Sequence, residues 1–289
     1  MEKKYKISQI DAFTKVSFKG NPAGVMLADG LTETEMQSIA REMNLSETAF
    51  LTPSAKADYK LQWFTPACQV ELCGHATIAS LHFLNENGLL KEGQSVKFDT
   101  LSGILNCGYA DGKYYMQIPV PSFSVYDGEK DEILKALGIT EQEVNGKLDW
   151  LILPNGYLFI NINKISELGS LKPDFGKIKG IKIPGYGVPQ IVAFTLETKD
   201  AGSYAHSRFF APGYGIDEDP VTGSANGPLI MALNKLGLLS FTEEITEKTF
   251  EQGDFIGHDG RVSVKYNKKT NEIYIAGFAK TVLQGEIIL

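Results

Sequence analysis

Glu47 is the first of three side chains in this sequence that could transfer a proton. It lies in segment 44–51, after a predicted helix and before a short apolar strand. A carboxylate at such a junction can project into a cleft, and partial burial would raise its pKa until it takes and returns a proton near neutral pH. The alternative is a solvated loop glutamate, which segment 44–51 taken alone favours.

His75 and Asp219 are the other two candidates. His75 follows Gly74 at a predicted helix start, where the helix dipole disfavours the imidazolium, so we expect a neutral ring that donates or accepts a hydrogen bond. Asp219 belongs to the acidic segment 217–219 before a second helix, and could partner Glu47 and His75 across a cleft. The alternatives are a structural histidine and acids that only cap a helix.

An internal repeat organises the chain around these residues. Residues 74–90 and 223–239 align without a gap and are identical at seven of 17 positions. Each copy follows an aromatic-x-proline segment and a loop, and each reads as a buried helix of about three to four turns. Both end at a glycine, Gly88 or Gly237, where a helix C-terminus favours a positive φ. The repeat predicts two halves of one architecture.

The predicted helix starts at Gly74 and Gly223 could bind an anion. The first N–H groups of a helix lack internal partners and carry partial positive charge, and glycine lets a ligand approach the backbone. Two such ends facing each other would hold a carboxylate between the halves. Ser224 stands where His75 stands in the other copy and would hydrogen-bond that ligand. Alternatively, both glycines only permit tight helix packing.

The rest of the pattern favours strands. Apolar residues alternate with polar ones over 114–118, at 262 and 264, and at 273 and 275. Helices are expected over 32–43, which a capping box opens, and over 130–138. Many strands with one central helix in each half predict an α+β fold rather than a doubly wound parallel sheet.

Two prolines, Pro119 and Pro121, interrupt strand pairing near the middle of the chain. We therefore expect an N-terminal domain over residues 1–118 and a C-terminal domain over 119–289. A tail over about 279–289 could return to the first domain.

Composition favours a small-molecule partner. The chain has 289 residues and a net charge of 28 − 35 = −7 without a basic block, which argues against nucleic acid or an anionic membrane as the main partner. It has no run of about 18 apolar residues and no signal-like start. Three cysteines, an odd number, predict reduced thiols and a cytoplasmic location.

A metal or a dinucleotide is not expected. Cys68, Cys73, His75 and His82 lie close in sequence, but their C-x4-C spacing is unlike a zinc site and no second ligand pair follows. His82 is predicted to be a packed helix residue. The Gly-x-Gly at 185–187 precedes a strand and lacks the helix and third glycine of a dinucleotide fingerprint.

Taken together, several segments resemble the PhzF family of phenazine-biosynthesis proteins, within the diaminopimelate-epimerase-like fold. They occur in family order from near the N-terminus to beyond residue 225, and the series is more specific than any one piece. The matching segments are 11–13, 20–25, 46–50, 71–77, 187–190, 207–212 and 218–225.

The resemblance implies two similar domains related by a pseudo-twofold axis, each a curled, barrel-like β-sheet around a central helix. It implies an active site between them, usually a homodimer, and no cofactor or metal. In the family's namesake, which isomerises trans-2,3-dihydro-3-hydroxyanthranilate, the residue matching Glu47 shifts a proton, assisted by those matching His75 and Asp219. The resemblance also implies ligand contacts from four small residues: Ser46, Gly74, Gly223 and Ser224.

Related epimerases instead use two cysteines, one on each side of the substrate carbon. Cys73 falls at the first position but Thr222 at the second, and an alcohol cannot replace a thiolate as a base. We therefore expect a single-carboxylate isomerase acting on a small carboxylic or amino acid. An epimerase using Glu47 with Cys73, and a binding protein that has lost catalysis, remain alternatives.

Overall fold

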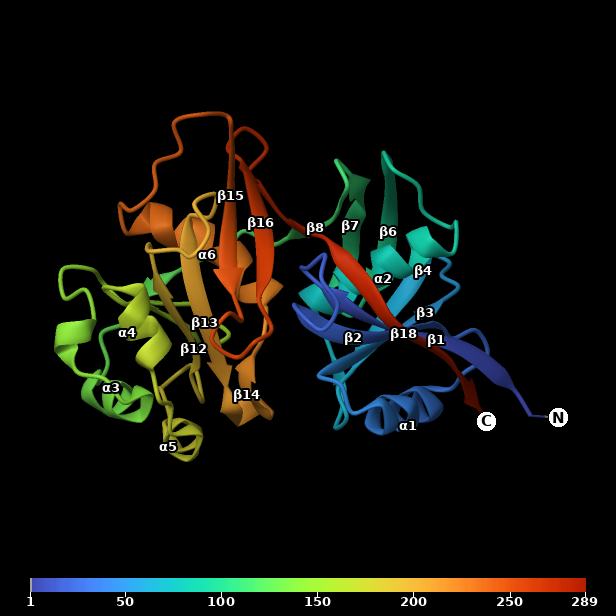
Figure 1. Cartoon of the computed structure of the whole chain (residues 1–289), viewed down its shortest axis with the longest axis horizontal. Helices are drawn as coiled ribbons and strands as arrows, with labels where there is room; N and C mark the ends of the chain where they lie inside the picture. Colours follow the sequence, from blue (N-terminus) through green and yellow to red (C-terminus); the bar gives the residue numbers. More distant parts are fainter. Residues whose placement is uncertain (1) are drawn as a thin grey trace. The chain divides into compact units, whose positions relative to one another are not determined.

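The computed structural model describes residues 2–289 and divides the chain into two compact units (Figure 1). Unit 1 comprises Met1–Ile118 and Tyr274–Leu289, and unit 2 comprises Pro119–Ile273. The chain thus re-enters unit 1 at Tyr274, within strand β17 (Glu272–Gly277). No helix in the described part of the chain is both long and apolar enough to cross a bilayer.

Unit 1 is a curled sheet that pairs in the order β18-β1-β2-β3-β4-β6-β7-β8. The pairs β2–β3 and β4–β6 are parallel and the other pairs are antiparallel. The short strand β5 pairs with the end of β4, whereas β6 pairs with the start of β4. The strands are β1 (Lys4–Ala12), β2 (Asn21–Leu27), β3 (Glu47–Thr52), β4 (Tyr59–Phe64), β5 (Gln69–Val70), β6 (Gln94–Thr100), β7 (Gly103–Ala110), β8 (Lys113–Ile118) and β18 (Ala279–Ile288).

Helix α2 (Gly74–Glu86) is the centre of unit 1. Its first eleven residues are all buried, and it contacts strands from both ends of the sheet, including β1, β8 and β18. A helix that is apolar all round must be enclosed by other elements, so the sheet curls around α2. It begins at the predicted glycine and ends before Gly88, whose φ of +73° confirms the predicted C-terminal signal.

Helix α1 (Glu33–Met43) covers the other face of the same sheet. Thr32 and Glu35 form the predicted capping box, and the apolar face of α1 packs on residues of β1 to β4. Asn44 ends the helix in the left-handed conformation, with φ of +51°. The turn it makes leads within three residues into β3, whose first residue is Glu47.

Unit 2 repeats this plan with extra helices. Its strands pair in the order β9-β10-β11-β12-β13-β15-β16. Strand β14 pairs with the end of β13, beyond the residues that pair with β15. In unit 1, β5 pairs with the end of β4 in the same way, beyond the residues that pair with β6. The strands are β9 (Ser124–Val125), β10 (Leu151–Ile152), β11 (Tyr157–Asn161), β12 (Gln190–Thr195), β13 (Ala205–Ala211), β14 (Ile216–Asp219), β15 (Ile245–Gln252) and β16 (Gly260–Asn267).

Helix α6 (Gly223–Lys235) is the counterpart of α2: it is 13 residues long, like α2, and largely buried. Its C-terminal glycine, Gly237, has the same φ of +73° as Gly88. The other helical segments are α3 (Asp131–Leu137), α4 (Ile165–Ser170), α5 (Phe175–Gly180), η1 (Glu141–Glu143) and η2 (Pro212–Tyr214). The α+β fold and the repeated central helix are confirmed. The sequence predicted α1 and α3 but missed the six-residue helices α4 and α5, which are too short for a periodic signal.

Candidate functional site

Glu47 is buried at the start of β3. Only 8% of it is exposed, because β3 pairs in parallel with β2 and places Glu47 beside Ala23. It is therefore not the solvated loop residue that its local sequence favours. The local sequence could not show this burial, because helix α1 separates β2 from β3 in the sequence and the two strands meet only in the folded chain.

His75, the second residue of α2, contacts three other side chains through its imidazole ring. Its Nε2 lies 3.3 Å from Glu47 Oε2 and 3.3 Å from Ser46 Oγ. Its Nδ1 lies 3.5 Å from Cys73 Sγ. The ring is only 5% exposed, so bulk water does not compete strongly for these contacts. We call Ser46, Glu47, Cys73 and His75 the α2 cluster.

The α2 cluster has the parts that proton transfer requires. A neutral imidazole carries one N–H and one acceptor nitrogen, so His75 can donate to the carboxylate or accept from a hydroxyl as the proton moves. Which ring nitrogen carries the proton depends on whether Glu47, Ser46 or Cys73 donates or accepts, and heavy-atom positions alone do not assign it. The N-cap residue Cys73 makes no side-chain capping hydrogen bond, and a helix N-terminus of this kind can bind an anionic group.

Asp219 belongs to a second buried cluster, in unit 2. Its carboxylate accepts the Thr222 hydroxyl at 2.5 Å, and only 5% of the residue is exposed. Gln252 donates its amide to the Asp219 carbonyl and to Thr222 Oγ1, and accepts the Thr222 N–H. Because Gln252 occupies the Thr222 oxygen as an acceptor, the Thr222 proton is directed at Asp219. Thr222 thus serves Asp219 and is not placed as a base.

The three acids before α6 have three different roles. Glu218 forms a two-bonded pair with Arg208, at 2.8 and 2.7 Å. Asp217 is exposed and lies 3.8 Å from Lys179. Asp219 receives the Thr222 hydroxyl, and the N-cap side chain of α6 makes no capping bond. Glu218 and Asp217 therefore contact basic side chains of β13 and α5 that lie outside α6.

Ser224 in the first turn of α6 has a partner that the sequence did not suggest. Its Oγ lies 3.0 Å from the hydroxyl of Tyr157 on β11. Tyr157 is 67 residues away in sequence, and no local motif marks it, so only the folded chain reveals the pair. Sequence analysis missed Tyr157 and Gln252, and also the buried Asn226, whose amide donates to Gln252 Oε1 and to the Thr222 carbonyl.

The predicted site residues thus fall in two groups. Ser46, Glu47, Gly74 and His75 belong to unit 1, whereas Asp219, Gly223 and Ser224 belong to unit 2. Within each group the structure brings the polar side chains together at the start of the central helix. The expected partnership of Asp219 with Glu47 and His75 stays a prediction.

Two groups in the described chain bring three potential metal ligands within 4.8 Å of one another: Glu47, Cys73 and His75, and His206, Glu251 and Asp254. In the first, thiol and carboxylate approach opposite nitrogens of one ring, so a metal that takes one nitrogen would require a side chain to turn. In the second, Arg261 already contacts both acids. Neither arrangement favours a metal, and its absence stays a prediction.

His82 is the packed helix residue that the sequence predicted. It is buried in α2, with Tyr114 3.0 Å from Nδ1 and with Thr281 and Glu86 at 3.1 and 3.2 Å from Nε2. Burial lowers the pKa of His82, and this effect outweighs the attraction of Glu86. The residue therefore ties the distal end of α2 to β8 and β18.

This burial predicts a pH-dependent stability. In the unfolded chain His82 titrates near the ordinary value of about 6.5, so the unfolded state takes up a proton before the folded state does. The free energy of unfolding should fall as pH drops below about 6.5, by up to about 1.4 kcal/mol per pH unit. Urea unfolding between pH 7.5 and 5 should show a shallower fall for His82→Gln. Equal slopes in both proteins would contradict this assignment.

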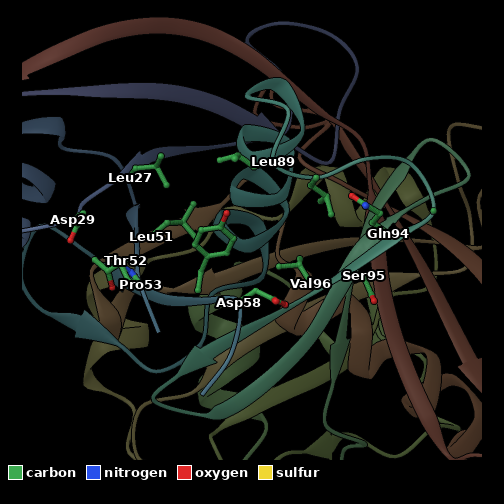
Figure 2. Close-up of a pocket in the computed structure, with 13 residues that line it drawn as sticks. Leu27, Asp29, Leu51, Thr52, Pro53, Asp58, Leu89, Gln94, Ser95 and Val96 are labelled. Atoms are coloured by element: carbon green, nitrogen blue, oxygen red, sulfur yellow. The ribbon is translucent and has the colours of Figure 1, made fainter. Parts of the chain in front are cut away.

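A large pocket lies elsewhere in unit 1 (Figure 2). It has a volume of about 840 Å³, and Leu51, Thr52, Asp58, Leu89 and Val96 are among its lining residues. It sits at the end of β3, whereas Glu47 starts that strand. At about 3.3 Å per residue, Glu47 lies more than 10 Å along the strand from this pocket. Its lining includes no histidine or cysteine, and we assign it no chemistry.

Comparison with known proteins shows one family across the chain. The model of the PhzC-PhzF family, described as phenazine biosynthesis-like protein, matches residues 10–285. An uncharacterised isomerase of Clostridium acetobutylicum is 40% identical, with 100% of each chain covered. The crystal structure of a Bacillus anthracis phenazine biosynthesis protein of the PhzF family is 32% identical, covers 99% of this chain and 100% of its own, and has a TM-score of 0.91.

More distant structures share the fold alone. A hydroxyproline epimerase from Agrobacterium vitis is 12% identical, with 99% of this chain and 93% of its own covered and a TM-score of 0.58. The epimerase-like fold that the sequence predicted is therefore confirmed.

Proposed function

This chain belongs to the phenazine biosynthesis-like PhzC-PhzF family, and from that membership we propose that it is a cofactor-independent isomerase. It moves a proton within a small carboxylic or amino acid by acid–base catalysis. Relatives across the family are named isomerases, which supports the reaction class. We also propose a cytoplasmic location, on the grounds of the three cysteines.

The observation that carries the proposal is the buried contact between Glu47 and His75, 3.3 Å apart at the start of α2. Glu47 removes a proton from an activated C–H bond and returns it at another carbon of the same molecule. His75 hydrogen-bonds the carboxylate and orients it, and the first N–H groups of α2 bind the negative charge that develops on the substrate. Asp219 and Ser224 are proposed to assist from unit 2.

One observation favours a second candidate, an epimerase that uses Cys73 with Glu47. The Cys73 thiol lies 3.5 Å from His75 Nδ1, and a thiol beside an imidazole at a helix start can become a thiolate base. Such an enzyme would remove a proton from a stereocentre and return one to the opposite face of the same carbon, instead of returning it at another carbon.

Exchange from heavy water tests both candidates. We would incubate a panel of small carboxylic and amino acids with wild type and with Cys73→Ser, and follow deuterium uptake by mass spectrometry and products by chiral chromatography. A constitutional isomer formed equally by both proteins supports the isomerase. A stereoisomer formed only when Cys73 is present supports the epimerase. Binding without exchange or product across the panel would contradict both and indicate a protein that binds small acids without catalysis.

A further inference from the structure

Five buried side chains of unit 2 form a series of hydrogen bonds that ends at the Asp219 carboxylate. Ser207 donates to Asn226 Oδ1 at 3.0 Å, and Asn226 Nδ2 donates to Gln252 Oε1 at 2.6 Å. Gln252 Nε2 donates to Thr222 Oγ1 at 3.0 Å, and the Thr222 hydroxyl donates to Asp219 Oδ2 at 2.5 Å. The five residues are at most 6% exposed. We call them the Asp219 network.

Backbone groups fix the orientation of both amides in the Asp219 network. Gln252 Oε1 faces the Thr222 N–H at 3.0 Å, a group that can only donate. Gln252 Nε2 faces the Asp219 carbonyl at 2.8 Å, and Asn226 Nδ2 faces the Thr222 carbonyl at 3.0 Å. Because a carbonyl can only accept, flipping either amide would set two acceptors against each other. The donors therefore point in one direction, from Ser207 toward Asp219.

Gln252 is the central member because its amide is fully used. An amide side chain has two N–H donors and an oxygen that accepts twice. Oε1 accepts from the Thr222 N–H and from Asn226, and Nε2 donates to the Asp219 carbonyl and to Thr222 Oγ1. The second of these donors turns the Thr222 proton toward Asp219. A buried polar network that is satisfied in this way holds its members rigidly.

We propose that Gln252 is a positioning residue for Asp219. Acting through Thr222, it holds the carboxylate in one orientation and keeps Oδ2 an acceptor during the reaction. The inference rests on the proposed function, in which Asp219 assists from unit 2. It gives Asp219 the role of a fixed acceptor, whereas Glu47 carries the proton. Because a misplacement of about 1 Å can lower a rate about 10²-fold, loss of this positioning should reduce kcat.

The first test needs no substrate. In protein made with isotopically labelled aspartate, the carboxyl carbon resonance of Asp219 is identified as the signal that Asp219→Asn lacks. Thr222→Val removes the hydroxyl and should shift this resonance, whereas Thr222→Ser should leave it near its wild-type position. Gln252→Glu replaces Nε2 with an acceptor that competes for the Thr222 proton, so it should shift the resonance in the same direction as Thr222→Val. A resonance that stays in place in Gln252→Glu would overturn the proposal.

The double variant separates positioning from a direct effect of the new charge. Once Thr222→Val has removed the hydroxyl, Gln252→Glu has no proton to redirect and should add little further shift. A further shift as large as that of Gln252→Glu alone would show that residue 252 acts on Asp219 directly, which would overturn the proposal. If Gln252→Glu does not fold, Gln252→Met removes the amide without adding a charge and should shift the resonance by the same loss of Thr222 orientation.

The second test is the rate in the exchange assay. Thr222→Val and Gln252→Glu should each lower kcat by about ten- to 100-fold, with KM within about two-fold of wild type. The double variant should be about as slow as the slower single variant, because residues that act in series are not additive. Thr222→Ser should recover at least about a third of the wild-type kcat. Losses that multiply in the double variant, or an unchanged kcat in Gln252→Glu, would overturn the proposal.

Gln142→Glu is the matched control. It makes the same chemical change on the exposed surface of unit 2, so it should leave both the resonance and kcat unchanged. The two tests also separate this inference from the proposed function. If wild type turns over no acid in the panel, the resonance still decides whether Gln252 positions Asp219. If wild type turns over and Gln252→Glu changes neither the resonance nor kcat, the positioning role fails while the isomerase stands.

Discussion

Glu47→Gln is expected to lose about 10²–10⁴-fold in turnover, the contribution typical of one positioned acid–base group. Glutamine keeps the size of the side chain and can still hydrogen-bond to His75, but it cannot take or return a proton. The loss should appear in kcat while KM changes little, because the substrate still binds the helix start. Initial rates on the acid that the exchange panel identifies would measure it.

Glu42→Gln is the matched control for this substitution. Glu42 lies on the exposed surface of α1, five residues from Glu47, and its replacement should leave the rate unchanged. Both variants should keep the thermal unfolding midpoint of the wild type within about 4 °C, because glutamine retains a hydrogen bond to His75 and a change of about 1 kcal/mol shifts the midpoint of a large domain by about 2–4 °C. If Glu47→Gln retained more than a third of the wild-type rate, Glu47 would not be the proton carrier.

Glu251→Ala is expected to destabilise the protein by about 3–5 kcal/mol, the usual effect of removing one partner from a buried charged network, here one that includes Arg261. Glu251 is fully buried beside His206, with 2.8 Å between Oε2 and Nδ1. Its carboxylate also accepts the backbone N–H groups of Lys199 and Asp200. Alanine would leave all three donors without this acceptor. Urea unfolding followed by tryptophan fluorescence in a Trp63→Phe background, which leaves Trp150 of the same unit as the reporter, would measure the change.

An exposed ion pair supplies the control. Asp217 lies 3.8 Å from Lys179, and both side chains are more than half exposed. Asp217→Ala should therefore change the free energy of unfolding by less than about 1 kcal/mol. A change below about 1 kcal/mol for Glu251→Ala as well would show that the buried network does not stabilise the fold.

Acid should weaken the same network. Burial alone would raise the pKa of Glu251, but the hydrogen bonds from His206, Lys199 and Asp200, with the charge of Arg261, lower it to about 2. In the unfolded chain the group titrates near about 4.3. Its stabilising effect is thus complete above about pH 4.5 and is lost as pH falls toward 2. Glu251→Gln should show a smaller loss of stability over that range.

The sequence predicted those elements of the fold whose signals lie within a few neighbouring residues. The capping box at Thr32, the helix starts at Gly74 and Gly223 and the C-terminal glycines depend on neighbours within a few residues, and all are confirmed. Strand alternation at β8 and β16 depends on period two along one segment and is confirmed as well. The short helices α4 and α5 were missed because six residues contain too little periodicity.

The candidate site was predicted only in part for the same reason. Repeat, motif order and family resemblance selected Glu47, His75 and Asp219, although each had a plausible structural alternative. Burial of Glu47 and its contact with His75 depend on the parallel pairing of β3 with β2 and on the position of α2. Tyr157 and Gln252 carry no local signal, since their partners lie 67 and 30 residues away.

By itself, then, the sequence determined the local elements, the repeat and the family, because these are encoded in neighbouring residues and in motif order. Only the tertiary structure decided which side chains meet. It placed His75 between a carboxylate and a thiol and directed the Thr222 proton at Asp219. These features depend on strand register and on contacts between distant segments, and a shift of one residue in register turns every side chain of a strand to the opposite face.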